Sequence, residues 1–130
     1  MGVDMETRIL YRPVGLFELQ LIRASDYVRF PPRLPEQPFF YPVLSFEYAE
    51  QIARDWNTRD EKSGYIGAVT RFKMPSGYLE QFPEQVVGGL IHRELWIPAE
   101  ELDSFNRQII GIIEIVAAYY GEQFDGEREW

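Results

Sequence analysis

Three side chains that can take part in chemistry alternate along IHRELWI, residues 91–97. Successive side chains of a strand point to opposite faces, so an extended segment places His92, Glu94 and Trp96 on one face. An imidazole, a carboxylate and an indole in a row suit a cleft that handles a sugar or a flat heterocycle. The same row is also typical of a half-exposed sheet face, and this segment alone leaves both interpretations open.

Two arginines and a tyrosine elsewhere in the chain could serve such a cleft. Arg12, in the run LYR, can hold a phosphate or form a salt bridge at the rim of the domain. Tyr41, in FFYPV, can supply a stacking surface for an aromatic ligand or belong to the core. Arg33 lies in the proline-rich segment FPPRLPEQP, whose stiffness would preserve its direction, although a surface position explains it equally well.

The composition excludes several kinds of site. The chain has no cysteine and one histidine, which rules out thiol catalysis, zinc ribbons, iron–sulfur centres and His-rich metal sites, so we expect no metal. GYIG and VGG match neither the Rossmann nor the P-loop pattern. The net charge of -8 argues against nucleic acid as a partner, because phosphate backbones need a basic face.

Length and hydrophobicity predict one domain. The 130 residues are 45% hydrophobic and 15% aromatic, enough for a single core without a disulfide or a structural metal. No stretch is long and apolar enough to span a membrane, and the first residues lack a signal-peptide pattern. We therefore expect a soluble, cytoplasmic protein with no membrane partner.

Hydrophobic periodicity predicts strands interleaved with a few helices. Ser45 is the expected N-cap of the better defined helix, whose buried face would run from Phe46 to Trp56. Residues 30–38 are expected to form a stiff loop, and residues 75–89 a connector with one helical turn. The other expected elements are strands near residues 6–13, 39–43, 65–72, 91–97 and 109–120, and helices near residues 16–22 and 98–106. For residues 109–120 the pattern favours a strand and leaves a helix as the alternative.

This pattern predicts an α+β domain with mixed or antiparallel sheets and two or three helices. We assign residues 1–120 to the domain, with a frayed start over residues 1–7. Residues 121–130 carry several acids and no apolar pattern, so we expect an acidic, flexible tail.

The segment FYPVLSFEYAEQIARDW, residues 40–56, resembles the second motif region of ADP-ribosyltransferases. It has a strand that ends in a tyrosine, a tight turn that begins at a serine, and a helix that contains alanine. LYR resembles the first strand of that family, and RELW the third, which bears the catalytic glutamate. The order of the three segments implies a small ADP-ribosyltransferase-like domain over most of residues 8–120.

The chain also resembles, nearly end to end, a group of small uncharacterised bacterial proteins that share LYRPVGL, FPPRLPEQP, FYPVL, IARDWN and ELWIPAEEL. Such proteins often carry a label that refers to ADP-ribosylation and J-type crystallin. By name this label belongs to longer, all-helical hydrolases that bind two magnesium ions through clustered aspartates. The aspartates here are scattered and the chain is far shorter, so we reject the hydrolase interpretation.

The transferase resemblance implies roles for individual residues. Glu94 would be the catalytic residue, Arg12 would orient NAD, and Tyr41 with Ser45 would pack the nicotinamide. His92 stands two residues before Glu94, where members that modify arginine carry Glu or Gln; we count it with the cofactor-binding residues. This difference, and YPVLS in place of a Ser-Thr-Ser signature, argue against an arginine target.

Three functions remain open at this point. The first is an NAD-dependent ADP-ribosyltransferase-like protein that acts on an unidentified macromolecular or small acceptor. The second is a non-catalytic binding module of the same shape, such as an immunity or regulatory partner, and the third is a structural domain. If NAD binds, Arg12 and at least one of Arg33, Arg54 and Arg71 should converge on one cleft, because a pyrophosphate needs a local positive site in an acidic protein.

Overall fold

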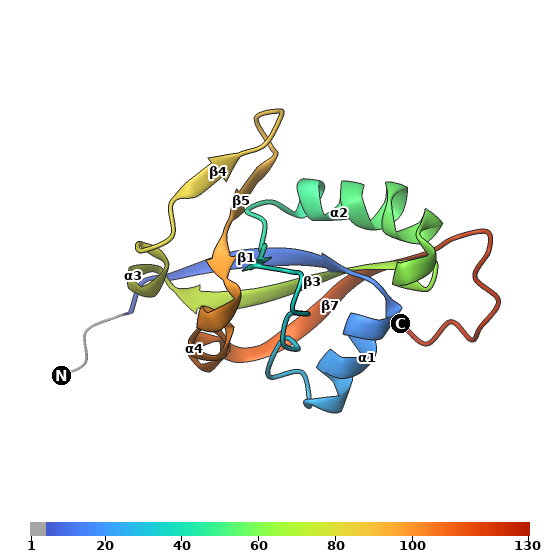
Figure 1. Ribbon diagram of the computed structural model, residues 1–130, viewed down its shortest axis with the longest axis horizontal. Helices are drawn as coiled ribbons and strands as arrows, with labels where there is room; N and C mark the ends of the chain where they lie inside the picture. The colour runs from blue at the N-terminus through green and yellow to red at the C-terminus, as the bar shows by residue number, and fades with distance from the viewer. Residues whose placement is uncertain (1–4) are drawn as a thin grey trace.

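Three long antiparallel strands form the centre of the molecule (Figure 1). The computed structural model describes residues 5–130. β1 (Thr7–Val14) and β7 (Ile110–Tyr120) flank β3 (Ile66–Pro75), which is the central strand and is nearly continuously buried. Two short antiparallel pairs complete the strands: β2 (Phe39–Phe40) with β6 (Ile97–Pro98), and β4 (Glu84–Val86) with β5 (Arg93–Leu95).

Four α-helices lie around this sheet within the described residues, so the α+β class is confirmed, with more helices than the two or three predicted. They are α1 (Leu16–Ala24), α2 (Phe46–Asp55), the single turn α3 (Ser76–Leu79) and α4 (Leu102–Gln108). Short 3₁₀ turns, Asn57–Arg59, Glu61–Ser63 and Ala99–Glu101, lie between them. None of these helices is both long and apolar enough to cross a membrane.

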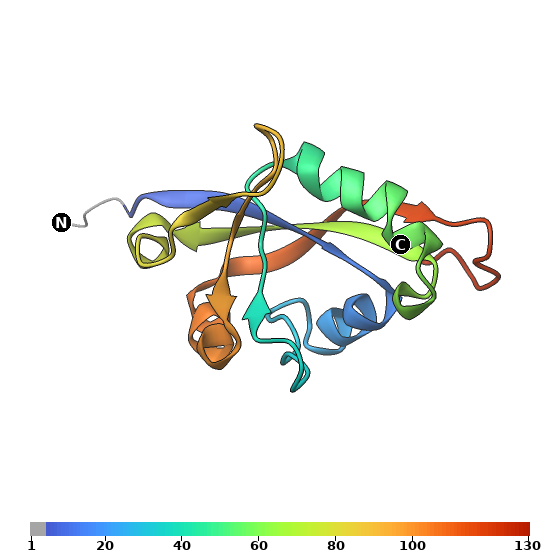
Figure 2. The ribbon, with the colours of Figure 1, turned by 45° about the horizontal axis from the view of Figure 1, so that its top comes forward.

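The helices divide the core between the two faces of the sheet. α2 covers one face, and α1 and α4 lie on the other (Figure 2). The larger core cluster lies on the α1 and α4 side and is dominated by four fully buried phenylalanines, Phe30, Phe40, Phe72 and Phe105. The smaller cluster, under α2, consists of Val43, Ala49, Ala53 and Val69. Its small side chains let α2 lie close to β3.

The predicted strand IHRELWI is wrong as a single element. It is divided into β5 and β6, with Trp96 between them, because the two parts pair with different strands. Leu95 and Ile97 are buried, as the alternation predicts, but Ile91 is exposed and lies in the turn of a hairpin formed by β4 and β5. β4 was not predicted at all.

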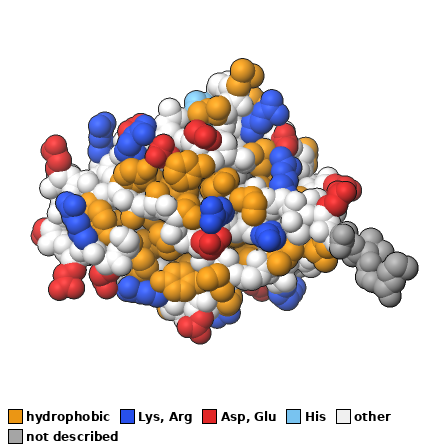
Figure 3. Space-filling view, turned by 180° about the vertical axis from the view of Figure 1, so that it is seen from behind, with side chains coloured by type: hydrophobic (Ala, Val, Ile, Leu, Met, Phe, Trp, Pro, Cys, Tyr) orange, Lys and Arg blue, Asp and Glu red, His pale blue; other side chains and the backbone are white. Residues whose placement is uncertain are grey.

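The β4–β5 hairpin projects from the body of the molecule (Figure 1). Its tip exposes Val87, Leu90 and Ile91, and Leu90 retains 85% of its accessible surface. In the space-filling view from behind, this tip is at the top, and hydrophobic side chains lie among acidic and basic ones over the face below it (Figure 3).

The two ends of the chain differ in how they meet the sheet. Of the predicted frayed start, residues 1–4 lie outside the described residues, and β1 begins at Thr7. Residues 121–130, the predicted flexible tail, contain no helix or strand and are largely exposed. Trp130 is the exception, since it packs against the larger core cluster and lies under the guanidinium of Arg23, 4.3 Å from the ring centroid.

Candidate functional site

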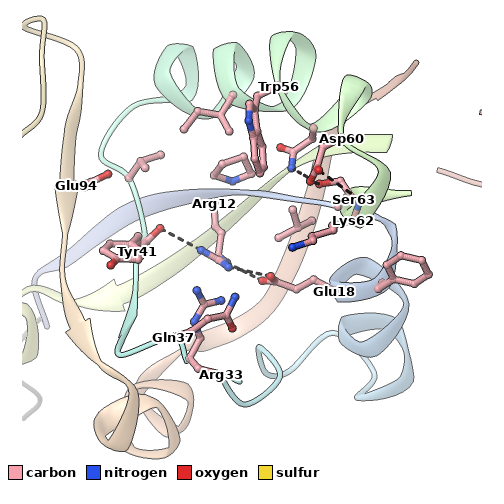
Figure 4. A pocket seen from close by; sticks show the side chains of 17 residues that line it. Arg12, Glu18, Arg33, Gln37, Tyr41, Trp56, Asp60, Lys62, Ser63 and Glu94 are labelled. Atoms are coloured by element: carbon pink, nitrogen blue, oxygen red, sulfur yellow. Dashed lines mark hydrogen bonds and ion pairs between the residues drawn. The ribbon is translucent and has the colours of Figure 1, made fainter. Parts of the chain in front are cut away.

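A cleft of about 800 Å³ lies beside β1, between α2 and the proline-rich loop of residues 30–38 (Figure 4). Its volume is in the range of small-molecule and cofactor sites. The end of β1, the start of α1, the proline-rich loop, the segment before α2, the turn after α2 and β5 all contribute to its walls. The charged side chains that line it are those of Arg12, Glu18, Arg33, Asp60, Lys62 and Glu94.

Arg12, Tyr41 and Glu94 line this one cleft although they lie far apart in the sequence. The segment before α2 connects them. Val43 forms an isolated bridge to Tyr11 on one side and to Glu94 on the other, so it ties the edge of β1 to β5. The backbone N–H of Tyr11 donates to the Val43 carbonyl at 3.0 Å, and the Val43 N–H donates back to the Tyr11 carbonyl at 2.7 Å.

Arg12 lines the cleft and is buried, with only 8% of its surface exposed. Nε and Nη2 donate to the two carboxylate oxygens of Glu18 at 2.6 and 2.8 Å, and Nη1 donates to the Tyr41 carbonyl at 3.3 Å. The guanidinium also lies 4.5 Å from the centre of the Phe40 ring. Three of the five N–H groups of the guanidinium are thus engaged, which leaves two for a ligand.

Arg33 brings a second guanidinium to the same wall (Figure 4). Its Nε donates to the Phe39 carbonyl at 2.9 Å, a contact that holds the side chain against the proline-rich loop. Burial, and then the positive charge of Arg12, lower the pKa of Arg33, while the negative charge of Glu18 opposes them. Only Arg12 forms an ion pair with Glu18, and a bound anion would relieve the repulsion between the two guanidiniums.

The carboxylate of Glu94 is held by two donors. Oε2 accepts from the hydroxyl of Tyr48 at 3.1 Å, and Oε1 accepts from the indole Nε1 of Trp96 at 2.9 Å. Burial, followed by the charge and hydrogen bond of Glu94, raises the pKa of Tyr48 to about 12, so this hydroxyl keeps its proton at neutral pH. The carboxylate is thereby positioned before any ligand arrives.

Aromatic rings surround Glu94 and Tyr41. The indole of Trp96 lies 5.8 Å from the ring of Phe39 and 6.2 Å, edge to face, from that of Tyr41. Such edge and tilted contacts fix the orientation of a ring without covering both of its faces. This end of the cleft therefore offers a carboxylate beside a half-buried tyrosine.

The opposite end of the cleft was not predicted. Trp56, Asp60, Lys62 and Ser63 line it (Figure 4). Trp56 was predicted on the buried face of α2, but the helix ends at Asp55 and Trp56 is 60% exposed. The polar segment NTRDEKSG, directly after the helix, could have indicated this end of the cleft, but it was interpreted only as a turn.

Ser45 and His92 are not among the residues that line the cleft. Ser45 caps α2, since its Oγ accepts from the Tyr48 N–H at 3.2 Å. The ring of His92 packs on Tyr48 at 4.8 Å, its Nδ1 accepts from the Gly89 N–H at 3.0 Å, and its Nε2 lies 2.7 Å from Oε1 of Gln51. The structure thus places both near Glu94 and its partners, and the predicted contact with a cofactor stays a prediction.

The other candidate arginines lie elsewhere. Arg54 pairs with Asp55 on the surface of α2, and Arg71 pairs with Glu114 across the sheet. Within residues 5–130 no three His, Asp or Glu side chains form a group that could hold a metal ion. Comparison of the chain with protein-family models, with curated proteins and with solved structures found no match, so the functional argument depends on the geometry of the cleft.

Proposed function

We propose that this protein is an NAD-dependent ADP-ribosyltransferase-like enzyme that binds NAD in the cleft and cleaves its nicotinamide–ribose bond. The observation that carries the proposal is the common position of Arg12, Tyr41 and Glu94 in the lining of one cleft. The resemblance of their three segments to the transferase motifs implies the same three residues. ADP-ribose would pass to water or to another acceptor.

Glu94 is the residue assigned to bond cleavage. When the bond between C1′ of the ribose and the nicotinamide nitrogen breaks, its electron pair goes to the pyridinium nitrogen, which becomes neutral. Positive charge develops on C1′ and the ring oxygen, and a fixed carboxylate stabilises that oxocarbenium ion. The acceptor adds to C1′ and loses its proton to solvent. The contacts from Tyr48 and Trp96 keep the carboxylate of Glu94 from turning away.

The two guanidiniums supply the pyrophosphate site. An acidic protein repels a dinucleotide at long range, so binding needs local positive charge. Arg12 and Arg33 both line the cleft, and Glu18 is the carboxylate that pairs with Arg12. Charge-assisted hydrogen bonds from these nitrogens to phosphate oxygens would hold the centre of the dinucleotide.

One observation favours the second candidate, a binding module without turnover. Both oxygens of Glu94 already accept hydrogen bonds from the protein, and Arg12 is already paired with Glu18. A site whose polar groups are satisfied this well could bind a nucleotide and leave it intact. The two candidates share the cleft and differ in whether nicotinamide is released.

Binding is tested first, by thermal unfolding and calorimetric titration with NAD. Ligand at 100 times its dissociation constant should stabilise the wild type by about 2.7 kcal/mol. Arg33→Ala should weaken NAD binding by about tenfold, since hydrogen bonds to charged groups contribute about 1.5–3 kcal/mol. Arg71→Ala, which removes an exposed arginine outside the cleft, is the control and should bind as the wild type does. Absence of any NAD binding to the wild type contradicts both candidates.

Turnover is tested by nicotinamide release from NAD. The proposal expects slow release by the wild type and its loss in Glu94→Gln, with NAD binding retained. Binding without release by the wild type would favour the second candidate. Equal release by both proteins would remove Glu94 from the mechanism.

A further inference from the structure

Trp56, the C-cap of α2, lines the cleft and retains 60% of its accessible surface. Its backbone is held on both sides, because its N–H donates to the Ile52 carbonyl at 3.0 Å and its carbonyl accepts from the Arg59 N–H at 3.0 Å. The backbone position of Trp56 is therefore fixed, while much of its side chain remains accessible. A large aromatic surface left open inside a polar cleft is suited to stacking with a flat ligand.

The order of groups along the cleft matches the order of groups in a dinucleotide. Tyr41 and Glu94 lie on one side of Arg12, and Trp56, Asp60 and Ser63 lie on the other side (Figure 4). An aromatic residue is thus available towards each end, with guanidiniums between them. NAD has a base at each end and a pyrophosphate between them.

We propose that the Trp56 end of the cleft is the adenine subsite, in which the indole stacks on the base and Asp60 accepts a hydrogen bond from its exocyclic amino group. The inference rests on the proposed function, because that function puts the nicotinamide beside Glu94 and so sends the adenosine to the other end.

The turn that carries Asp60 is held by its own hydrogen bonds. Asn57 Nδ2 donates to Ser63 Oγ at 2.9 Å, and Ser63 Oγ donates to Asp60 Oδ2 at 2.7 Å. Asp60 Oδ1 accepts from the Lys62 N–H at 3.3 Å. The turn closes at Gly64, whose φ of 65° is in the left-handed region. Asp60 is therefore positioned in advance, and each of its oxygens retains further acceptor capacity.

The chemistry of Asp60 makes the subsite selective for an amino group. An ionised carboxylate only accepts hydrogen bonds, so it pairs with the amino group of adenine and repels the carbonyl oxygen that hypoxanthine carries at the same position. A site built on stacking alone would bind both bases equally, since every base has an aromatic face.

The stacking is tested by titration of NAD and nicotinamide mononucleotide, which lacks the adenosine, into wild type and Trp56→Ala. The variant should bind NAD about tenfold more weakly, as loss of one stacking aromatic does elsewhere, and should bind the mononucleotide unchanged. Leu21→Ala, at a similarly exposed position on α1 outside the cleft lining, is the control and should change neither affinity. Equal loss for both ligands, or no loss for NAD, would overturn the subsite.

The hydrogen bond is tested with the hypoxanthine analogue of NAD. The wild type should prefer NAD, and Asp60→Asn, whose amide can donate to the carbonyl, should narrow or reverse this preference. Equal affinity of the wild type for the two dinucleotides would remove Asp60 from base recognition. A wild type that binds NAD with no effect of Trp56→Ala refutes only the subsite, whereas a wild type that binds no NAD refutes the proposed function itself.

Discussion

At the scale of single residues, Glu94 depends on Tyr48 for its position. The hydroxyl of Tyr48 donates to Oε2 of Glu94, and its ring packs on His92. The catalytic candidate is thus connected through Tyr48 to α2 and through Trp96 to the β5–β6 junction. Small displacements of a positioned carboxylate are costly in catalysis, so these partners matter even though neither is in the cleft lining.

The Tyr48 contact predicts a dependence of stability on alkaline pH. Burial and Glu94 raise the pKa of Tyr48 to about 12, whereas an unfolded tyrosine titrates near 10. Between those values the unfolded chain loses a proton that the folded chain keeps, so stability falls as the pH rises through this window. Below pH 10 the contribution of protonated Tyr48 to the free energy of unfolding is fully present.

Tyr48→Phe should remove this contribution. Urea unfolding at pH 9 and pH 11 should show a smaller loss of unfolding free energy in the variant than in the wild type. The raised pKa values of Tyr78 and Tyr119 remain in both proteins, so the difference between them isolates Tyr48. Identical losses in the two proteins would contradict the assigned contact.

Residue type made Arg12, Tyr41 and Glu94 candidates but left a structural interpretation open for each, and only the resemblance of their three segments to the transferase motifs grouped them. Trp56 was misplaced, since helical periodicity is informative only while the helix continues, and Trp56 is the C-cap, one residue beyond the last helical residue, Asp55. For Arg33 the sequence could not decide between the cleft and the open surface. A stiff loop indicates that a side chain keeps its direction, but not which direction that is.

At the scale of elements, the position of α2 determines the width of the cleft. α2 begins at the Ser45 cap and packs on β3 through alanines. The Ser45 cap and the helix after it were predicted from the sequence, although the helix ends one residue before Trp56. The sequence could not predict that β5 and β6 are separate, because strand division is decided by long-range partners, here β4 and β2.

The close approach of α2 to β3 predicts a severe effect of one methyl group. A Cβ on Gly67 would overlap the backbone carbonyl of Ala53, which cannot move unless α2 shifts. We expect Gly67→Ala to lower the free energy of unfolding by at least about 2 kcal/mol, as overpacked cores do.

Gly77→Ala is the matched control for Gly67→Ala. A Cβ at Gly77 would meet no atom within 4 Å, and the residue lies in α3, so the substitution should be neutral or stabilising by about 0.5 kcal/mol. Both are measured by urea unfolding. Equal effects of the two substitutions would show that α2 does not lie as close to the sheet as described.

At the scale of the whole molecule, the residues after β7 are part of the packing. The backbone N–H of Trp130 donates to the hydroxyl of Tyr120 at 3.0 Å, and the indole contacts the larger core cluster under Arg23. Composition predicted a flexible acidic segment here, because acids outnumber apolar residues. A single tryptophan at the far end of such a segment is too weak a pattern to reveal that it returns to the core.

Trp130→Ala should therefore destabilise the protein. Burial of part of an indole predicts a loss of about 1–2 kcal/mol of unfolding free energy. Glu127→Ala, at an exposed position in the same segment, should leave it unchanged. Chemical denaturation of both variants checks this, and a wild-type value for Trp130→Ala would mean that the segment does not pack.

The most direct test of NAD binding in the cleft is a titration of ¹⁵N-labelled protein with NAD. The three indole N–H signals are followed by NMR. Trp96 contacts Glu94 and Trp56 lines the cleft, whereas Trp130 lies against α1, outside the cleft lining. If NAD binds in the cleft, the Trp96 and Trp56 signals should move together with increasing NAD while that of Trp130 stays in place. No movement at millimolar NAD, or movement of the Trp130 signal alone, would contradict NAD binding in the cleft.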